Sequence, residues 1–145
     1  MKKFILILFI IITIFVAIIC LKYSSYKNEY NNVIRQNAEF EEYTDKEIYG
    51  TELATLINKS IDKNTKNKIE KNENGIFIPN EENSIKIEIY IKDNEQKYEM
   101  ETFYNTGMKQ FIQYYGDIQF KCSKIEYHKK TGKIKYLLFE QTVTS

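Results

Sequence analysis

The sequence predicts an α+β protein: a long N-terminal helix and a second, amphipathic helix packed on a four- to five-stranded antiparallel sheet, with a short connecting helix. Three observations support this fold class. Neither Gly nor Pro occurs from Met1 to Tyr49. Apolar residues then recur at helical spacing, and the second half of the chain alternates apolar and polar residues as strands do. The 145 residues suffice for one domain and a membrane anchor.

An apolar run from Phe4 to Leu21 lies near the start of the sequence. About 20 apolar residues cross a bilayer as a helix, and tilt or local thinning accommodates a slightly shorter run. Lys2 and Lys3 precede the run, and lysines beside a span favour the cytoplasmic side. We therefore predict a cytoplasmic tail (residues 1–3), a single transmembrane helix in contact with membrane lipid (residues 4–21) and an extracytoplasmic remainder.

Three other N-terminal signals fit the run less well. A cleaved signal peptide has an apolar region of roughly 7–15 residues followed by a small-x-small site, and the sequence has no such site here. A lipoprotein signal would need a small residue before Cys20, where the chain has Ile19. The Gly and Glu of a type IV prepilin are absent. An uncleaved anchor is preferred, with cleavage and lipidation left as alternatives.

The anchor helix is expected to continue beyond the membrane as a stalk over residues 22–43. Tyr26, Tyr30, Ile34 and Phe40 fall at helical spacing, which predicts a helix end near Glu41 or Tyr43. The tyrosines that directly follow the run suit the lipid headgroup region, and they suit packing on the domain equally well. Residues 44–145 are then the extracytoplasmic α+β domain, with a connection over residues 43–50.

The second helix is predicted to begin with Thr51 as its cap and to end near Lys63. Leu53, Leu56, Ile57 and Ile61 form its apolar stripe. Residues 64–75 are almost wholly polar and predict a mobile loop, followed by a short strand over residues 76–78.

Two hairpins are predicted in the second half. Residues 84–92 and 97–103 form the first, around a turn at 93–96. A short helix follows, capped by Thr106 and ended by Gly116. The apolar parity changes between residues 118–122 and 125–127, which predicts a bulge near Ser123–Lys124. A turn at Thr131–Gly132 leads into the last strand, residues 134–141.

No catalytic constellation is recognisable, and we expect a protein that is not an enzyme and has no cofactor. His128 is the only histidine, beside two lysines at a predicted turn, and is expected to be solvated. Cys122 is expected in the core as a small hydrophobe, and a Cys122–His128 nucleophile would lack a third orienting group. Cys20 and Cys122 do not make a disulfide framework. The net charge of +1 does not indicate a nucleic-acid partner.

One segment has the ligand spacing of a calcium loop. Glu70, Asn72, Asn74 and Glu81 occupy positions 1, 3, 5 and 12, with Gly75 at position 6. A proline inside the loop and a predicted strand after it oppose an EF-hand. A polar loop before the hairpin is preferred, and calcium binding stays open.

The aromatic residues of the second half admit two interpretations. They could form a ligand platform, but their alternating and helical spacing is more typical of core filling. The residues concerned are Tyr98, Phe103, Tyr104, Phe111, Tyr114, Tyr115, Phe120, Tyr127, Tyr136 and Phe139.

The soluble part resembles a group of small, uncharacterised, single-pass proteins of low-GC Gram-positive bacteria. The resemblance is carried by Phe40-x-x-Tyr43, by Tyr49-Gly50-Thr51-x-Leu53-x-x-Leu56-Ile57-x-x-x-Ile61-Asp62-x-Asn64, by the strand from Ser84 to Ile89, and by the hairpin from Ile125 to Ile134. It implies a membrane-tethered surface protein and no catalytic residues. A long helix laid on a sheet is also the layout of pilins.

We therefore expect an extracytoplasmic interaction or structural protein, part of a pilus-like or envelope assembly, with a protein partner or self-association. The alternative is a tethered sensor of a small ligand or of calcium.

Overall fold

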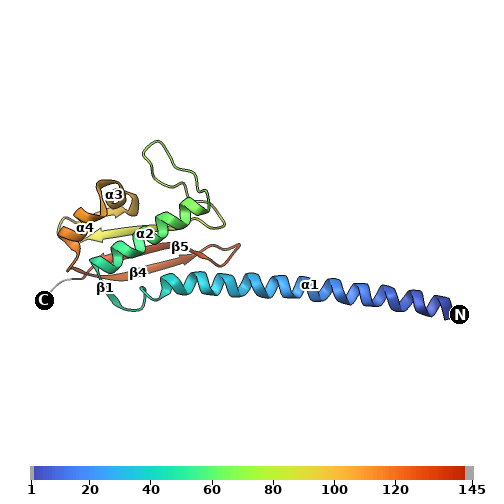
Figure 1. Cartoon of the computed structure of the whole chain (residues 1–145). Helices are drawn as coiled ribbons and strands as arrows, with labels where there is room; N and C mark the ends of the chain where they lie inside the picture. Colours follow the sequence, from blue (N-terminus) through green and yellow to red (C-terminus); the bar gives the residue numbers. More distant parts are fainter. Residues whose placement is uncertain (1, 143–145) are drawn as a thin grey trace. The chain divides into compact units, whose positions relative to one another are not determined.

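The computed structural model describes residues 2–142 and divides into two compact units, Met1–Arg35 and Gln36–Ser145 (Figure 1). The first unit consists of most of helix α1 (Lys2–Glu41), a single helix of 40 residues. The predicted long helix ending near Glu41 is therefore confirmed. Of the predicted tail, Met1 lies outside the described residues, whereas Lys2 and Lys3 are the first helical residues.

The second unit contains a five-stranded sheet in the order β1-β4-β5-β2-β3. The strands are β1 (Glu47–Tyr49), β2 (Lys86–Ile91), β3 (Gln96–Glu99), β4 (Gln119–Tyr127) and β5 (Ile134–Gln141). The hairpins β2–β3 and β4–β5 are antiparallel, as predicted. The register of β4 shifts between Cys122 and Lys124, which confirms the predicted bulge.

The sheet is mixed, so the prediction of a fully antiparallel sheet is wrong. The two hairpins join through β2 and β5, which run parallel with Ile87 opposite Leu137. A hairpin turn fixes the direction of its own two strands and not the direction in which two hairpins meet. The helices between β3 and β4 return the chain across the sheet, and this crossover brings β5 in parallel to β2.

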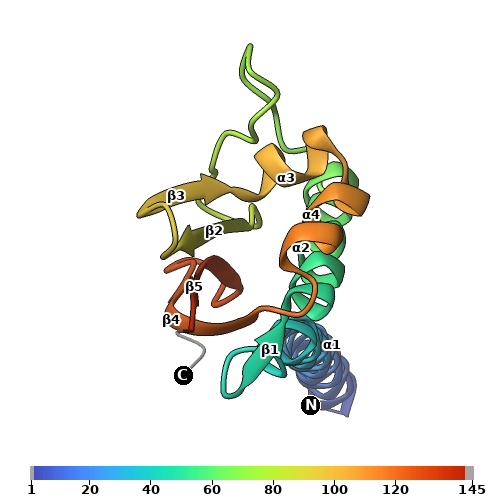
Figure 2. The ribbon, with the colours of Figure 1, turned by 90° about the vertical axis from the view of Figure 1, so that its left-hand side faces the viewer.

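Helices α2 (Gly50–Lys66), α3 (Met100–Thr106) and α4 (Met108–Tyr115) lie on one side of the sheet (Figure 2). The apolar stripe predicted on α2 is buried, with Leu53, Leu56 and Ile57 wholly inaccessible. Alternate residues of β2 complete the core from the sheet side, because Ile87 and Ile89 face the helices and are equally inaccessible.

The start of α2 differs from the prediction. The helix begins at Gly50, and Tyr49 is the residue before it. The carboxylate of Glu52 accepts a hydrogen bond from the Tyr49 backbone N–H at 3.0 Å, which is one half of a capping box. Thr51 is therefore inside the helix and is not the cap. The helix also continues to Lys66, because Asn64 is buried in the core rather than exposed in a loop.

Three further boundaries depart from the sequence patterns. The connection over residues 43–50 contains edge strand β1, which pairs with β4 so that Ile48 lies opposite Phe120. The strand predicted over residues 97–103 ends at Glu99, because Met100 and Phe103 bury themselves as one face of a helical turn. Residues 76–78 form no regular strand and contribute one isolated bridge, Lys71 to Phe77.

The predicted Thr106 cap is also incorrect. Thr106 is the last residue of α3, and Gly107 separates α3 from α4. Gly107 has a φ of 105°, a positive value that glycine adopts without strain. Gly116 directly follows α4, as predicted.

Candidate functional site

Helix α1 contains the segment that is long and apolar enough to cross a membrane by length and composition. The large apolar side chains of residues 4–21 are all exposed, with exposed fractions from 48% for Ile18 to 73% for Phe4. An uninterrupted exposed apolar helix of this length is compatible with a single-pass anchor.

The part of α1 that follows the apolar segment has an exposed aromatic stripe, which we define as Tyr23, Tyr26, Tyr30 and Ile34. Their exposed fractions range from 50% for Ile34 to 68% for Tyr26. At 3.6 residues per turn these four side chains leave one face of the helix. Asn28 and Asn32 leave the opposite face, so the segment is amphipathic without a core to cover its apolar side.

The last turns of α1 belong to the domain. Phe40 is 1% exposed and contributes to the core. The side chain of Asn37 donates to the Gly132 carbonyl at 2.8 Å and accepts from the Ile134 backbone N–H at 3.0 Å. One amide thus binds both sides of the turn between β4 and β5, which ties the helix end to the sheet.

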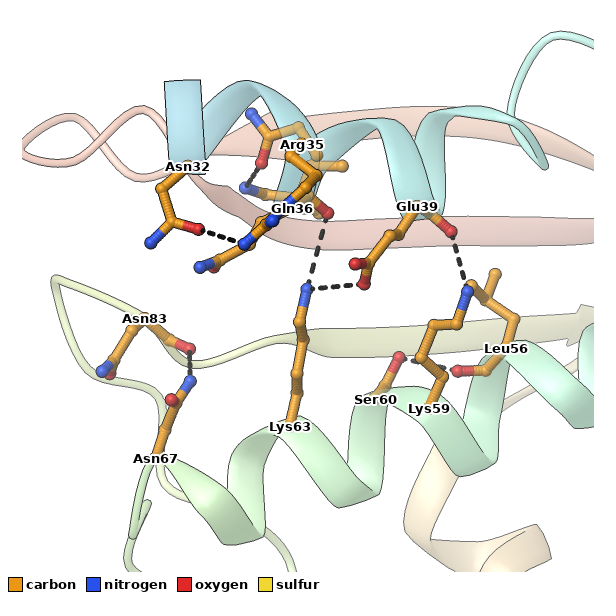
Figure 3. Close-up of polar contacts among 12 residues, drawn as sticks. Asn32, Arg35, Gln36, Glu39, Leu56, Lys59, Ser60, Lys63, Asn67 and Asn83 are labelled. Atoms are coloured by element: carbon orange, nitrogen blue, oxygen red, sulfur yellow. Dashed lines mark hydrogen bonds and ion pairs between the residues drawn. The ribbon is translucent and has the colours of Figure 1, made fainter. Parts of the chain in front are cut away.

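Lysines of α2 bind the same helix end (Figure 3). Lys63 Nζ lies 3.2 Å from a carboxylate oxygen of Glu39 and 4.6 Å from the centroid of the Phe40 ring. Lys59 Nζ donates to the Glu39 carbonyl at 3.3 Å. Cations at the carboxyl end of a helix interact favourably with its unpaired carbonyls, so these contacts stabilise the terminus of α1.

The segment with the ligand spacing of a calcium loop, Glu70 to Glu81, begins with a local hairpin of its own. The side-chain oxygen of Asn72 accepts hydrogen bonds from the backbone N–H groups of Asn74 and Ile76, each at 3.0 Å. This Asx turn occupies the oxygen that an EF-hand would direct at the ion. Within residues 2–142 no cluster of three acidic, histidine or cysteine side chains is placed to hold a metal.

His128 is buried, so the prediction of a solvated histidine at the turn is wrong. It is 1% exposed, and its Nε2 lies 2.8 Å from the Ser84 carbonyl. Because a carbonyl only accepts, Nε2 carries the proton. His128 thereby ties the end of β4 to the segment that leads into β2.

Cys122 is only partly buried, at the β4 bulge, and its thiol donates to the Lys124 carbonyl. Burial raises the pKa of this thiol, which opposes the thiolate form. The Cys122 side chain has no hydrogen bond to His128 among the residues described, so the structure provides no activated nucleophile between them.

Glu101 of α3 is a buried acid that the sequence did not single out. It is 3% exposed, and one carboxylate oxygen accepts from the Phe77 backbone N–H at 3.2 Å. The other oxygen has no partner among the described residues. Burial raises the pKa of this carboxyl group above its ordinary value, and the neighbouring Glu99 carboxylate adds to the effect.

The sheet face opposite the helices is charged. Lys86 Nζ lies 3.0 Å from Glu88 and 2.8 Å from Glu99, and the Tyr136 hydroxyl donates to Glu88 at 2.7 Å. Burial and the Glu88 carboxylate raise the pKa of Tyr136, so this hydroxyl keeps its proton. These groups satisfy one another across three strands, as an exposed sheet face requires.

A hollow, which we call the aromatic groove, lies between β3, α3 and α4. Its volume is about 240 Å³. Phe103 and Phe111 are buried in it with ring centroids 4.6 Å apart, whereas Tyr114 is 63% exposed. The lining residues are Tyr98, Thr102, Phe103, Thr106, Gln110, Phe111, Tyr114 and Tyr115.

The comparison with known proteins gives no relative. The chain matches no protein-family model, no curated protein and no solved structure.

Proposed function

We propose that the protein is a single-pass, membrane-tethered interaction or structural protein whose domain lies on the extracytoplasmic side, as part of a pilus-like or envelope assembly. The observation that carries the proposal is the aromatic stripe of α1. It follows the apolar segment on the same helix, and Tyr23, Tyr26 and Tyr30 remain exposed.

The tether is supported by composition and by helix continuity. Among residues 2–142 the apolar side chains of residues 4–21 have no partner that would bury them. Lipid is the environment in which such a surface is stable, because exposing it to water costs roughly 25 cal/mol per Å². The lysines before the apolar segment support a cytoplasmic N-terminus.

The interaction role is supported by the amphipathic character of the extramembrane helix. Aromatic side chains are enriched where proteins bind one another. Two copies in one membrane would present their stripes in parallel and at the same height, so a second copy is the simplest partner. Lipid headgroups would cover only the part of the stripe nearest the membrane.

Crosslinking tests the stripe directly. A photoreactive phenylalanine analogue replaces Tyr26 or Tyr30 in intact cells, and the matched control places it at Asn28 or Asn32 on the opposite face. We expect a specific adduct, with the chain itself or one protein, from the stripe positions only. Equal yields from both faces, or adducts with lipid alone at every stripe position, would contradict an interface.

Protease treatment of whole cells tests the orientation separately. We expect the domain to be cleaved from outside while the N-terminal tail is protected. Protection of the domain until the cells are lysed would reverse the proposed topology and leave the anchor itself intact.

A further inference from the structure

The aromatic groove is unlike the rest of the surface because none of its eight lining residues carries a charge. Charged residues make up 28% of the chain. The hollow on the open sheet face, by comparison, is lined by three lysines and two glutamates. A ligand that fills the aromatic groove therefore gains nothing from a formal charge, and a charged ligand would lose solvation without an ion-pair partner.

The floor of the groove is apolar and firmly packed. Phe103 contacts three aromatic neighbours: its ring centroid lies 4.6 Å from Phe111, 5.3 Å from Tyr98 and 6.0 Å from Tyr115. Phe111 is 2% exposed and Phe103 8%, so these rings are part of the core and support the groove from below. Tyr114 stands at the rim with most of its ring accessible for stacking.

Four polar side chains of the groove are free to bind a ligand, whereas the Tyr98 hydroxyl is already bonded to Asn94 and Gln96. The hydroxyls of Thr102, Tyr114 and Tyr115 and the amide of Gln110 have no partner among residues 2–142, whereas the Thr106 hydroxyl is bonded to the Thr102 carbonyl. Burial raises the pKa of Tyr115, so its hydroxyl stays a donor at neutral pH. Uncharged hydroxyls and an amide can both donate and accept, as a ligand rich in hydroxyl groups requires.

We propose that the aromatic groove binds a neutral carbohydrate, one hexose or N-acetylhexosamine unit of a glycan at a time. The apolar face of the sugar ring stacks on Tyr114 over the Phe103–Phe111 floor, and the sugar hydroxyls bond to Gln110 and the free hydroxyls. A volume of about 240 Å³ suits one ring rather than a drug-sized molecule. The inference goes beyond the proposed tether, because the site lies wholly within residues 98–115.

A proline-rich peptide is the main competing occupant, since such peptides also dock in aromatic grooves. The free hydroxyls and the amide favour the sugar, because a polyproline segment offers carbonyl acceptors and few donors. The peptide is therefore an outcome of the test rather than a second proposal.

The test uses the full chain in lipid nanodiscs, because glycoside detergents would compete for the site. The probes are tetramers of β-1,4-linked N-acetylglucosamine and of β-1,4-linked glucose, with a proline-rich peptide in parallel. Ligand-observed NMR and calorimetry report binding. We expect saturable binding of at least one tetramer, weakened about tenfold by Tyr114→Ala and much less by Tyr114→Phe, which keeps the ring.

Tyr104→Ala is the matched control. Tyr104 is a 42% exposed tyrosine of α3 that does not line the groove, so its loss should leave affinity unchanged. Each variant is accepted only with an unchanged unfolding temperature, and Gln110→Ala replaces any variant that unfolds early. The proposal is overturned if neither tetramer binds, if Tyr104→Ala weakens binding as much as Tyr114→Ala, or if only the peptide binds. Crosslinking through Tyr26 and Tyr30 would be unaffected by any of these results.

Discussion

Asn64 and Ile85 bind each other in both directions: the Asn64 amide donates to the Ile85 carbonyl at 2.7 Å, and its side-chain oxygen accepts from the Ile85 backbone N–H at 2.8 Å. Asn64 is wholly inaccessible to solvent. The side chain thus acts as a strand neighbour for the residue just before β2. It fixes where the segment after α2 rejoins the sheet.

Replacing Asn64 by alanine should lower the free energy of unfolding by about 2–4 kcal/mol, because two buried backbone groups of Ile85 lose their partners. Urea unfolding followed by circular dichroism measures the change. Asn67→Ala is the control, since its exposed amide makes one bond, to the Asn83 carbonyl at 3.0 Å, and should cost under about 1 kcal/mol. Equal losses in the two variants would refute the role assigned to Asn64.

Gly50 is required by a close approach of two backbones. A Cβ atom there would lie 1.9 Å from the Tyr115 carbonyl oxygen and 2.6 Å from its carbon. Gly50→Ala must therefore separate α2 from the end of α4, and we expect a loss of about 3 kcal/mol in unfolding free energy. Thr51→Ala should change stability by no more than about 0.5 kcal/mol, whereas a helix cap would cost about 1 kcal/mol. A neutral Gly50→Ala variant would show that α4 moves freely.

Glu101 should make stability depend on pH. Burial raises its pKa in the folded state, so the folded protein binds the proton more tightly than the unfolded chain does. Its contribution is fully present below the ordinary carboxyl pKa of about 4.3 and is lost as pH rises through the raised value. Glu101→Gln, which mimics the protonated acid, should therefore stabilise the protein at pH 7 and have little effect near pH 4.

Thermal unfolding of the full chain across this pH range would measure the effect of Glu101. Glu73→Gln, a change at an exposed carboxylate in the segment after α2, should leave the pH profile unaltered. A Glu101→Gln variant that is equally destabilised at both pH values would instead indicate a packing role without a proton.

Calcium should not stabilise the chain through the loop from Glu70 to Glu81. The Asn72 oxygen is already bonded to two backbone N–H groups, and an ion would have to break both. We expect an unchanged unfolding temperature on addition of calcium. A rise that disappears in Glu81→Gln would establish the EF-hand interpretation that the spacing first raised.

Much of the fold is predictable because local rules decide it. The absence of glycine and proline from the first 49 residues predicts the long helix. The change of apolar parity predicts the β4 bulge near Ser123. The parallel pairing of β2 with β5 is not local, since it joins Ile87 to Leu137 across fifty residues of sequence. No turn signal reports on such a contact, so the mixed sheet could not be derived.

Buried polar residues mark the other limit of sequence reasoning. Three polar residues of types usually found at the surface are buried, and each binds a backbone group of the segment over residues 67–85. They are Asn64, Glu101 and His128. They are buried because that segment packs over them in the folded domain. The spacing of apolar residues in the sequence does not reveal this packing. The aromatic groove is a similar case: Phe111 fills the core as expected, whereas Tyr114 on the same helix stays accessible.

The central position of β5 has a consequence for the order of events during synthesis. β5 lies between β4 and β2 and is the last regular element described. The two halves of the sheet, β1–β4 and β2–β3, therefore cannot join until β5 has been synthesised. A ribosome adds about 5–20 residues per second, so one edge of β2 and one edge of β4 stay unpaired until synthesis reaches β5. A chain shortened before Ile134 would keep helix α1 and lose the strand that joins β4 to β2, so completion of the five-stranded sheet depends on its final strand.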